Sequence, residues 1–144
     1  MGYKEILLIE DNETDAELAI RALRKVDANH HITHLEDGAE ALDYLFPKTE
    51  KEAAGTLPKL ILLDIKLPKV NGLEVLKAIK KSTSIHSIPV IMLTSSKELA
   101  DIQDAYALGA NSYIVKPVEF EKFQDALKTL GHYWMWVNQA PILK

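Results

Sequence analysis

The sequence predicts an α/β fold in which one parallel sheet of five strands carries helices on both faces. Short apolar runs alternate with segments of helical periodicity, and this alternation occurs five times along the 144 residues. The first run contains Ile6-Leu7-Leu8-Ile9, apolar at successive positions, as in a parallel strand that is covered on both faces. Five such units in a chain of single-domain length predict a doubly wound sheet.

Each predicted strand is a short apolar run bounded by polar or turn-forming residues. The second run is the weakest and ends before Asp37-Gly38, whereas the third, Leu60–Leu63, is apolar throughout. Pro89 opens the fourth run. The predicted strands are 5–9, 31–35, 60–63, 90–93 and 113–115.

A helical segment follows each predicted strand. Thr14 and Glu17 have the spacing of a capping box at the start of the first helix. Gly109 stands where a glycine ends the fourth helix. The fifth helix has an apolar face that steps by three and four and predicts core positions Phe120, Phe123, Leu127, Leu130 and Trp134. The predicted helices are one after Thr14, then 39–46, 73–81, 97–108 and 119–137.

We expect one domain over residues 1–138, with a long loop insertion at 47–58 and a C-terminal tail at 139–144. The loop is charged and unusually long for a compact domain, and Pro141 separates the tail from the last helix. Because nothing but this short tail follows the last helix, the sequence predicts no output domain.

Composition excludes several classes of function. The chain has no cysteine, which excludes disulfide scaffolds, zinc fingers and cysteine nucleophiles. A net charge of −4 argues against a nucleic-acid partner, because phosphate binding needs clustered basic residues. The apolar runs are too short to cross a membrane, and no signal peptide is visible. We therefore expect a cytoplasmic protein without a membrane partner.

Polar residues end four of the predicted strands. Glu10 and Asp11 follow the first strand, Asp64 the third, Thr94 the fourth and Lys116 the fifth. Ligands of open parallel sheets bind at the carboxyl ends of the strands, so these side chains should share one site. Three carboxylates repel one another, and one lysine does not neutralise them. Oxygen ligands without histidine or cysteine favour Mg²⁺.

This set of residues suits phosphoryl transfer. The transferred group carries negative charge, which a metal ion, a cation and hydrogen-bond donors stabilise. Lys116 supplies the cation and Thr94 a donor, while Asp64 is the candidate nucleophile.

Along nearly its whole length, the chain resembles the receiver domain of two-component response regulators. The resemblance implies a flavodoxin-like receiver fold with strand order 2-1-3-4-5. The motifs that carry it are Ile9-Glu10-Asp11, Asp64 to Gly72 (DIKLPKVNG), Leu93-Thr94-Ser95, Leu108-Gly109-Ala110 and Tyr113 to Pro117 (YIVKP).

The resemblance implies a phosphoacceptor and a metal site. Asp64 matches the phosphoacceptor, which would receive its phosphoryl group from the phosphohistidine of a sensor kinase. Asp11 matches a direct ligand of Mg²⁺, Glu10 an acid that usually acts through water, and the backbone carbonyl of Lys66 the third protein ligand.

The resemblance also implies the residues that pair with phosphate and switch the conformation. Lys116 matches the lysine that pairs with the phosphoryl group, and the following bond to Pro117 is cis in this family. Thr94 and Tyr113 match the two switch residues. Phosphorylation would then shift an equilibrium of the fourth helix and fifth strand toward a state that another protein recognises.

The long loop and the aromatic C-terminal end resemble the small regulators that partner bacterial phytochromes. This implies a phytochrome-like sensor histidine kinase, a downstream protein target and a homodimer as partners. Trp136 falls off the apolar face of the last helix, so we expect it to be exposed and available for a protein contact.

Alternative functions remain open at this point. A Mg²⁺-dependent phosphohydrolase with an aspartyl intermediate usually carries Asp-x-Asp after the first strand, whereas here Asp64 ends the third strand. A nucleotide or flavin module needs a glycine-rich or hydroxyl-rich loop after the first strand, which is acidic here. A receiver that binds partners without phosphorylation is disfavoured by the intact residue set. A metal site at His30, His31 and His34 is also disfavoured, because His31 and His34 face opposite sides of a strand.

Overall fold

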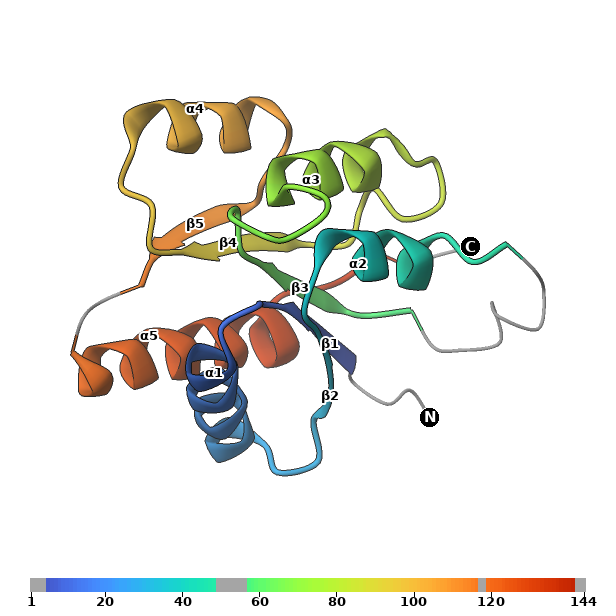
Figure 1. The fold of residues 1–144 in the computed structure, drawn as a ribbon. Helices are drawn as coiled ribbons and strands as arrows, with labels where there is room; N and C mark the ends of the chain where they lie inside the picture. Colours follow the sequence, from blue (N-terminus) through green and yellow to red (C-terminus); the bar gives the residue numbers. More distant parts are fainter. Residues whose placement is uncertain (1–4, 49–56, 117–118, 142–144) are drawn as a thin grey trace.

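The computed structural model describes residues 5–48, 57–116 and 119–141, and these form one five-stranded parallel sheet with helices on both faces (Figure 1). The strand order is β2-β1-β3-β4-β5, as predicted. The strands are β1 (Glu5–Ile9), β2 (His31–Leu35), β3 (Leu60–Leu63), β4 (Val90–Thr94) and β5 (Ser112–Val115). The helices are α1 (Glu13–Val26), α2 (Gly38–Leu45), α3 (Gly72–Lys81), α4 (Leu99–Ala107) and α5 (Phe120–His132), followed by a π-helical turn, η2 (Tyr133–Val137).

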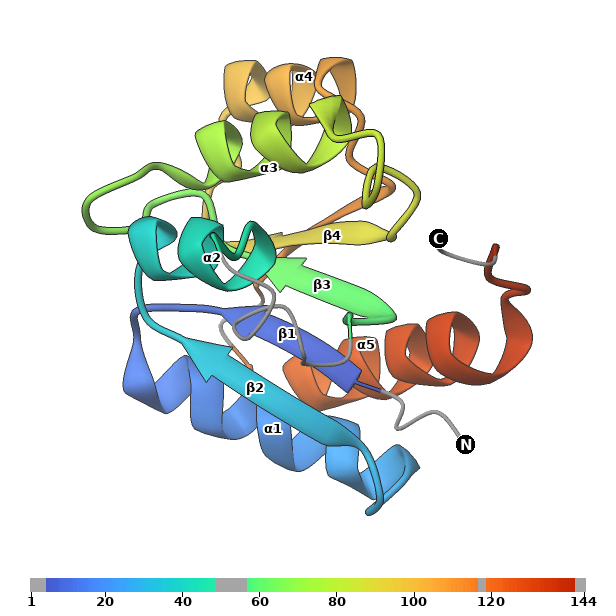
Figure 2. The same ribbon diagram turned by 90° about the vertical axis from the view of Figure 1, so that its right-hand side faces the viewer.

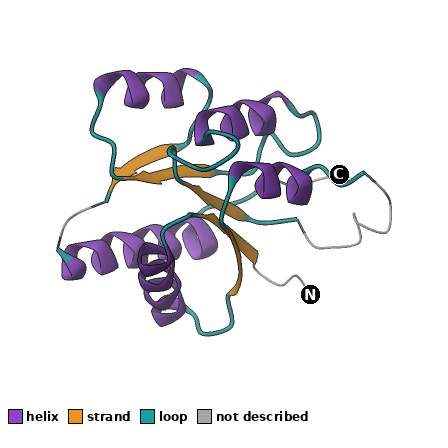
Figure 3. Ribbon diagram, viewed as in Figure 1, coloured by secondary structure: helices purple, strands orange, loops and turns teal. Residues whose placement is uncertain are grey.

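Two layers of helices sandwich the sheet. Helices α1 and α5 cover one face, and α2, α3 and α4 cover the other; the turned view in Figure 2 agrees, and Figure 3 shows the strands between the helical layers. Alternate residues of one strand therefore enter two separate cores. In β1, Leu7 and Ile9 pack toward α2 and α3, whereas Ile6 and Leu8 pack toward α1 and α5.

Burial explains why the apolar runs in the sequence predict strands. The three central strands β1, β3 and β4 are buried at every residue, whereas the edge strands β2 and β5 are mostly half-buried. A strand buried on both faces needs apolar residues at successive positions, as in Leu60–Leu63. The edge strands tolerate polar residues, which is why the second run looked weaker in the sequence.

Helix α1 begins differently from the prediction. The capping box at Thr14 and Glu17 is wrong, because the helix starts at Glu13 and Asn12 is its N-cap. The Asn12 side chain accepts a hydrogen bond of 2.9 Å from the backbone N–H of Asp15. Glu17 instead pairs with Arg21 one turn later.

Helix α4 starts two residues after the predicted Lys97. The Ser96 hydroxyl accepts a hydrogen bond from the Glu98 backbone N–H and donates one of 2.6 Å to Asp101, which keeps the preceding residues out of the helix. At its other end, Gly109 has a φ of +105°, the left-handed conformation expected of a glycine after a helix.

The last helix departs most from its predicted face. The α-helix ends at His132, and the π-helical turn that follows shifts the buried position from Trp134 to Met135, which is 1% exposed. Trp134 is half-buried against the core, and Phe120, predicted as core, is 46% exposed because it is the first residue of the helix. Trp136 is exposed, as predicted.

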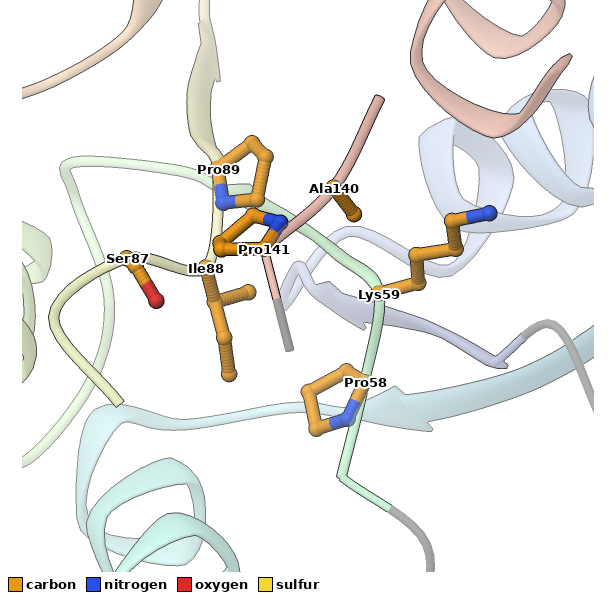
Figure 4. Close-up of a pocket in the computed structure, with 7 residues that line it drawn as sticks. All are labelled: Pro58, Lys59, Ser87, Ile88, Pro89, Ala140 and Pro141. Atoms are coloured by element: carbon orange, nitrogen blue, oxygen red, sulfur yellow. The ribbon is translucent and has the colours of Figure 1, made fainter. Parts of the chain in front are cut away.

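A cavity of about 290 Å³ lies at the amino ends of β3 and β4. Pro58, Pro89 and Pro141 line it together with Ile88, and the Lys59 side chain extends away from them (Figure 4). This cavity is at the opposite end of the strands from the predicted site.

Candidate functional site

The Lys116 ammonium lies at the centre of an acidic cluster at the carboxyl edge of the sheet. Its Nζ is 3.2 Å from Asp64 Oδ2 and 3.0 Å from Asp15 Oδ2, and it forms an ion pair with Glu10 Oε1. Lys116 is held in place because its backbone N–H donates a 2.8 Å hydrogen bond to the Thr94 carbonyl, which joins the ends of β4 and β5. One cation thus contacts carboxylates that follow β1 and β3 and one from the first turn of α1.

Glu10, Asp11 and Asp64 form the predicted carboxylate group. One oxygen of each lies within 4.8 Å of the oxygens of the other two, which is close enough for a single ion to contact all three. Glu10 and Asp64 are buried, whereas Asp11 is exposed. Neighbouring strands bring these residues together, because Ile9 and Leu63, directly before them, are paired in register.

Burial shapes the electrostatics of this group. Burial raises the pKa of the Glu10 carboxyl to about 7; the Asp64 charge adds to this rise, and the Lys116 contact opposes it. Burial alone lowers the pKa of Lys116, but its hydrogen bond to Glu10 and the charge of Asp64 raise it above the ordinary value. Lys116 is therefore charged, and the carboxylates around it outnumber it.

The backbone fixes Asp64 and the loop after it. Asp64 Oδ1 accepts a 2.7 Å hydrogen bond from the Ile65 N–H, and Asp64 Oδ2 faces Lys116. The Gly72 N–H donates to the Ile65 carbonyl at 2.7 Å, which folds the loop back onto the end of β3. A Cβ on Gly72 would lie 1.9 Å from the Asp64 carbonyl oxygen, so only glycine permits this approach.

The predicted switch residues Thr94 and Tyr113 are joined through Ser96. Thr94 is buried, and its Oγ1 accepts a hydrogen bond of 3.3 Å from the Ser96 N–H. The Tyr113 hydroxyl donates a hydrogen bond of 3.0 Å to the Ser96 carbonyl. Because the Ser96 hydroxyl also contacts the first turn of α4, one residue connects Thr94, Tyr113 and that helix. Ser96 was not predicted from the sequence.

Asp15 is the other residue that sequence reasoning missed. It lies in the first turn of α1, and its carboxylate reaches Lys116 from the helix rather than from a strand end. The sequence contained a signal for Asp15: it is four residues, about one helical turn, after Asp11, and α1 starts at the same edge of the sheet.

The remaining predicted positions lie around this cluster. The Lys66 side chain is exposed, and its backbone belongs to the loop after Asp64. His34 does not join His30 and His31 in a metal site; its Nε2 donates a 2.7 Å hydrogen bond to the Glu10 carbonyl. Pro117, and so the expected cis bond after Lys116, lies outside the described residues.

The arrangement favours a hard divalent cation. Three carboxylate oxygens converge and outnumber the one ammonium beside them, and oxygen ligands match the preferences of such ions.

Among the described helices, none combines the length and apolar character that crossing a bilayer requires.

Comparisons with known proteins identify the family of this chain. The model of the response regulator receiver domain matches residues 6–128. The probable methanogenesis regulatory protein FilR2 of Methanothrix harundinacea is 40% identical over 136 residues, covering 94% of this chain and 86% of FilR2. The response regulator Rcp1 of Synechocystis is 34% identical over 138 residues, covering 96% of this chain and 93% of Rcp1.

Solved structures show the same relationship. The phosphorylated cyanobacterial phytochrome response regulator RcpA superposes with a TM-score of 0.92 at 35% identity, over 98% of this chain and 100% of RcpA. The Mn²⁺-bound form of Rcp1 superposes with a TM-score of 0.89 at 33% identity, over 96% of this chain and 99% of the other. The chain therefore belongs to the response regulator receiver family and is a two-component signalling protein.

Proposed function

Starting from its membership of the receiver family, we propose that this protein is cytoplasmic and accepts a phosphoryl group on Asp64 from the phosphohistidine of a sensor histidine kinase. The observation that carries the proposal is the environment of Asp64. Its carboxylate ends a buried strand, faces the Lys116 ammonium at 3.2 Å, and lies beside the carboxylates of Glu10 and Asp11. A charged nucleophile, a cation and a metal-binding acid group are the elements that phosphoryl transfer requires.

Mg²⁺ is the ion that we assign to this site. The carboxylates of Asp11 and Asp64 would hold it directly, Glu10 through water, and the Lys66 carbonyl would complete the protein ligands. When bound, Mg²⁺ would neutralise negative charge on the phosphoryl oxygens. The excess of carboxylates over cations supports this assignment.

The chain's own residues account for the transfer. An oxygen of Asp64 attacks the phosphorus as the P–N bond of the phosphohistidine breaks, and the electron pair returns to the imidazole. The Ile65 N–H holds the other Asp64 oxygen and so fixes the plane of the carboxylate. Lys116 pairs with a phosphoryl oxygen, and the Thr94 hydroxyl moves from its bond with Ser96 toward another.

Intact mass spectrometry tests this assignment. The protein is incubated with acetyl phosphate, with and without Mg²⁺, as wild type and as Asp64→Asn. We expect the mass of one phosphoryl group on the wild type with Mg²⁺ and none on the variant. A mass increase that persists in Asp64→Asn, or that needs no divalent ion, contradicts the proposal.

The contacts of Ser96 support a switch that runs from the phosphoryl site to α4. When Thr94 turns toward the phosphoryl group, its bond to Ser96 is lost, and the bonds from Ser96 to Tyr113 and Asp101 must adjust. Helix α4 also has no side-chain N-cap. We expect amide hydrogen exchange over 99–107 to change when trifluoroberyllate occupies the site, and to stay unchanged in Asp64→Asn.

A phytochrome-like sensor histidine kinase is the partner that we propose. RcpA is named as a phytochrome response regulator, and its structure matches nearly all of this chain. Phosphotransfer from a phytochrome-type kinase should be faster than from a kinase of another sensor class. Equal rates from both kinases would contradict the proposed phytochrome-type partner and would leave the proposed role of Asp64 unaffected.

The rate at which the protein hydrolyses free phosphate esters distinguishes the proposed signalling function from that of a phosphohydrolase. The protein should promote its own phosphorylation and dephosphorylation but not turn over p-nitrophenyl phosphate at many equivalents per hour. Steady turnover that Asp64→Asn abolishes would support the enzyme instead.

The exposed aromatic end supports a homodimer. Tyr133, Trp136 and Val137 are each about half exposed on the π-helical turn. We expect sedimentation analysis to show a dimer that Trp136→Ser weakens, whereas Tyr106→Ser, an exposed aromatic on α4, serves as the control. A wild-type monomer at all concentrations contradicts this proposal.

A further inference from the structure

Asp15 occupies the third hydrogen-bonding position of the Lys116 ammonium. An ammonium group has three N–H donors, and those of Lys116 face Glu10, Asp64 and Asp15. Every donor of the lysine that is proposed to bind the phosphoryl group is therefore engaged by a carboxylate in the unphosphorylated protein.

The three carboxylates differ in their access to solvent. The side chains of Glu10 and Asp64 are 3% and 9% exposed, whereas that of Asp15 is 35% exposed. A carboxylate that leaves an ammonium for water loses least when it is already partly hydrated. Asp15 is thus the partner that Lys116 gives up at the lowest cost.

The first turn of α1 holds Asp15 in this position. Its backbone N–H donates to the Asn12 side chain at 2.9 Å, so the helix cap orients the residue whose carboxylate meets Lys116. The proposed function requires Glu10 for the metal, and Asp64 itself carries the phosphoryl group, so Asp15 is the carboxylate beside Lys116 that has neither role.

We propose that Asp15 is a positioning residue that holds Lys116 before phosphorylation and competes with the phosphoryl group for it. The inference rests on the proposed role of Asp64 and deepens it, because it names the residue that sets how tightly the site holds a phosphoryl anion. Asp15 keeps Lys116 at the site, and it also makes each incoming anion displace or share an existing ion pair. Removal of this carboxylate should therefore strengthen anion binding.

Trifluoroberyllate, a mimic of the phosphoryl group, tests the proposal with Mg²⁺ present. The concentration that gives half occupancy is measured by ¹⁹F NMR for wild type, Asp15→Asn and Asp15→Ala. We expect both variants to bind about three- to fivefold more tightly, the size of effect of a partly exposed ion pair. A residue that only supports the fold would weaken binding when it is replaced, so a gain in affinity identifies competition.

Glu17→Gln is the matched control, because it removes one negative charge from the same helix without contacting Lys116; Glu17 pairs with Arg21. We expect its affinity to equal that of wild type. Unchanged or weaker binding in both Asp15 variants overturns the proposal, as does an equal gain in Glu17→Gln, which would indicate a general charge effect. If wild type itself binds no trifluoroberyllate with Mg²⁺, the proposed role of Asp64 fails, and this inference fails with it.

Discussion

Replacement of Glu10 by glutamine should stabilise the metal-free protein at alkaline pH and leave it nearly unchanged in acid. Burial holds the pKa of Glu10 at about 7 in the folded state, against an ordinary value of 4.5. The folded protein therefore binds more protons than the unfolded chain between these values. Its stability falls as the pH rises from about 4.5 to 7, and the loss is complete above pH 7.

The size of this effect follows from the two pKa values. Each pKa unit corresponds to about 1.4 kcal/mol, so the ionised Glu10 side chain costs at most about 3 kcal/mol at pH 8. At pH 5 the same calculation gives less than about 1 kcal/mol. Glutamine resembles the protonated carboxyl in shape and does not ionise, so it avoids this loss.

Urea denaturation with a chelator at pH 5 and pH 8 measures the difference. The stabilisation of Glu10→Gln should appear at pH 8 and largely vanish at pH 5, whereas the exposed Glu17→Gln should change stability by no more than about 0.5 kcal/mol at either pH. If Glu10→Gln is less stable than wild type at pH 8, the ion pair with Lys116 outweighs burial, and the reasoning is refuted.

Four further changes have defined outcomes. Gly72→Ala places a Cβ 1.9 Å from the Asp64 carbonyl and should both lower the thermal midpoint and slow phosphorylation by acetyl phosphate. Asn12→Ala removes the cap of α1 and should cost about 1 kcal/mol in urea denaturation. The Lys80 ammonium donates to two loop carbonyls and to the Asn111 side chain, so Lys80→Met should cost about 1–3 kcal/mol, whereas Lys81→Met on the exposed face should be nearly neutral. Saturation with Mg²⁺ at about one hundred times its dissociation constant should stabilise wild type by about 2.7 kcal/mol and Asp64→Asn by clearly less.

The strands were predictable because burial on two faces leaves a direct trace in the sequence. Leu60–Leu63 cannot be a surface segment, and its bounds match the prediction. The same logic located Glu10, Asp11 and Asp64, because parallel strands in register place the residues after their ends at one edge. Strand patterns therefore predicted both the sheet and most of the candidate site.

The features that were missed depend on contacts between elements. Asn12 and Thr14 are both good caps by type, and the choice depends on where the chain leaves β1. The π-helical turn moves Met135 into the core in place of Trp134, which a regular 3.6-residue period does not predict. Asp15 and Ser96 are ordinary helix-start and loop residues in the sequence; their partners Lys116 and Tyr113 lie directly after and within β5.

There is a physical reason for the excess of negative over positive charge in the acidic cluster. A site whose carboxylates were fully paired with lysines would fold more stably, but it would have no charge left to attract a divalent ion. Here one ammonium faces Glu10, Asp15 and Asp64. Burial first, and then repulsion from the Asp64 charge, raise the pKa of Glu10. The same repulsion that weakens the metal-free fold is released when a cation arrives. Glu10→Gln removes one of these carboxylates, so we expect it to bind Mg²⁺ more weakly than wild type, as well as to be more stable than wild type at pH 8 without the metal.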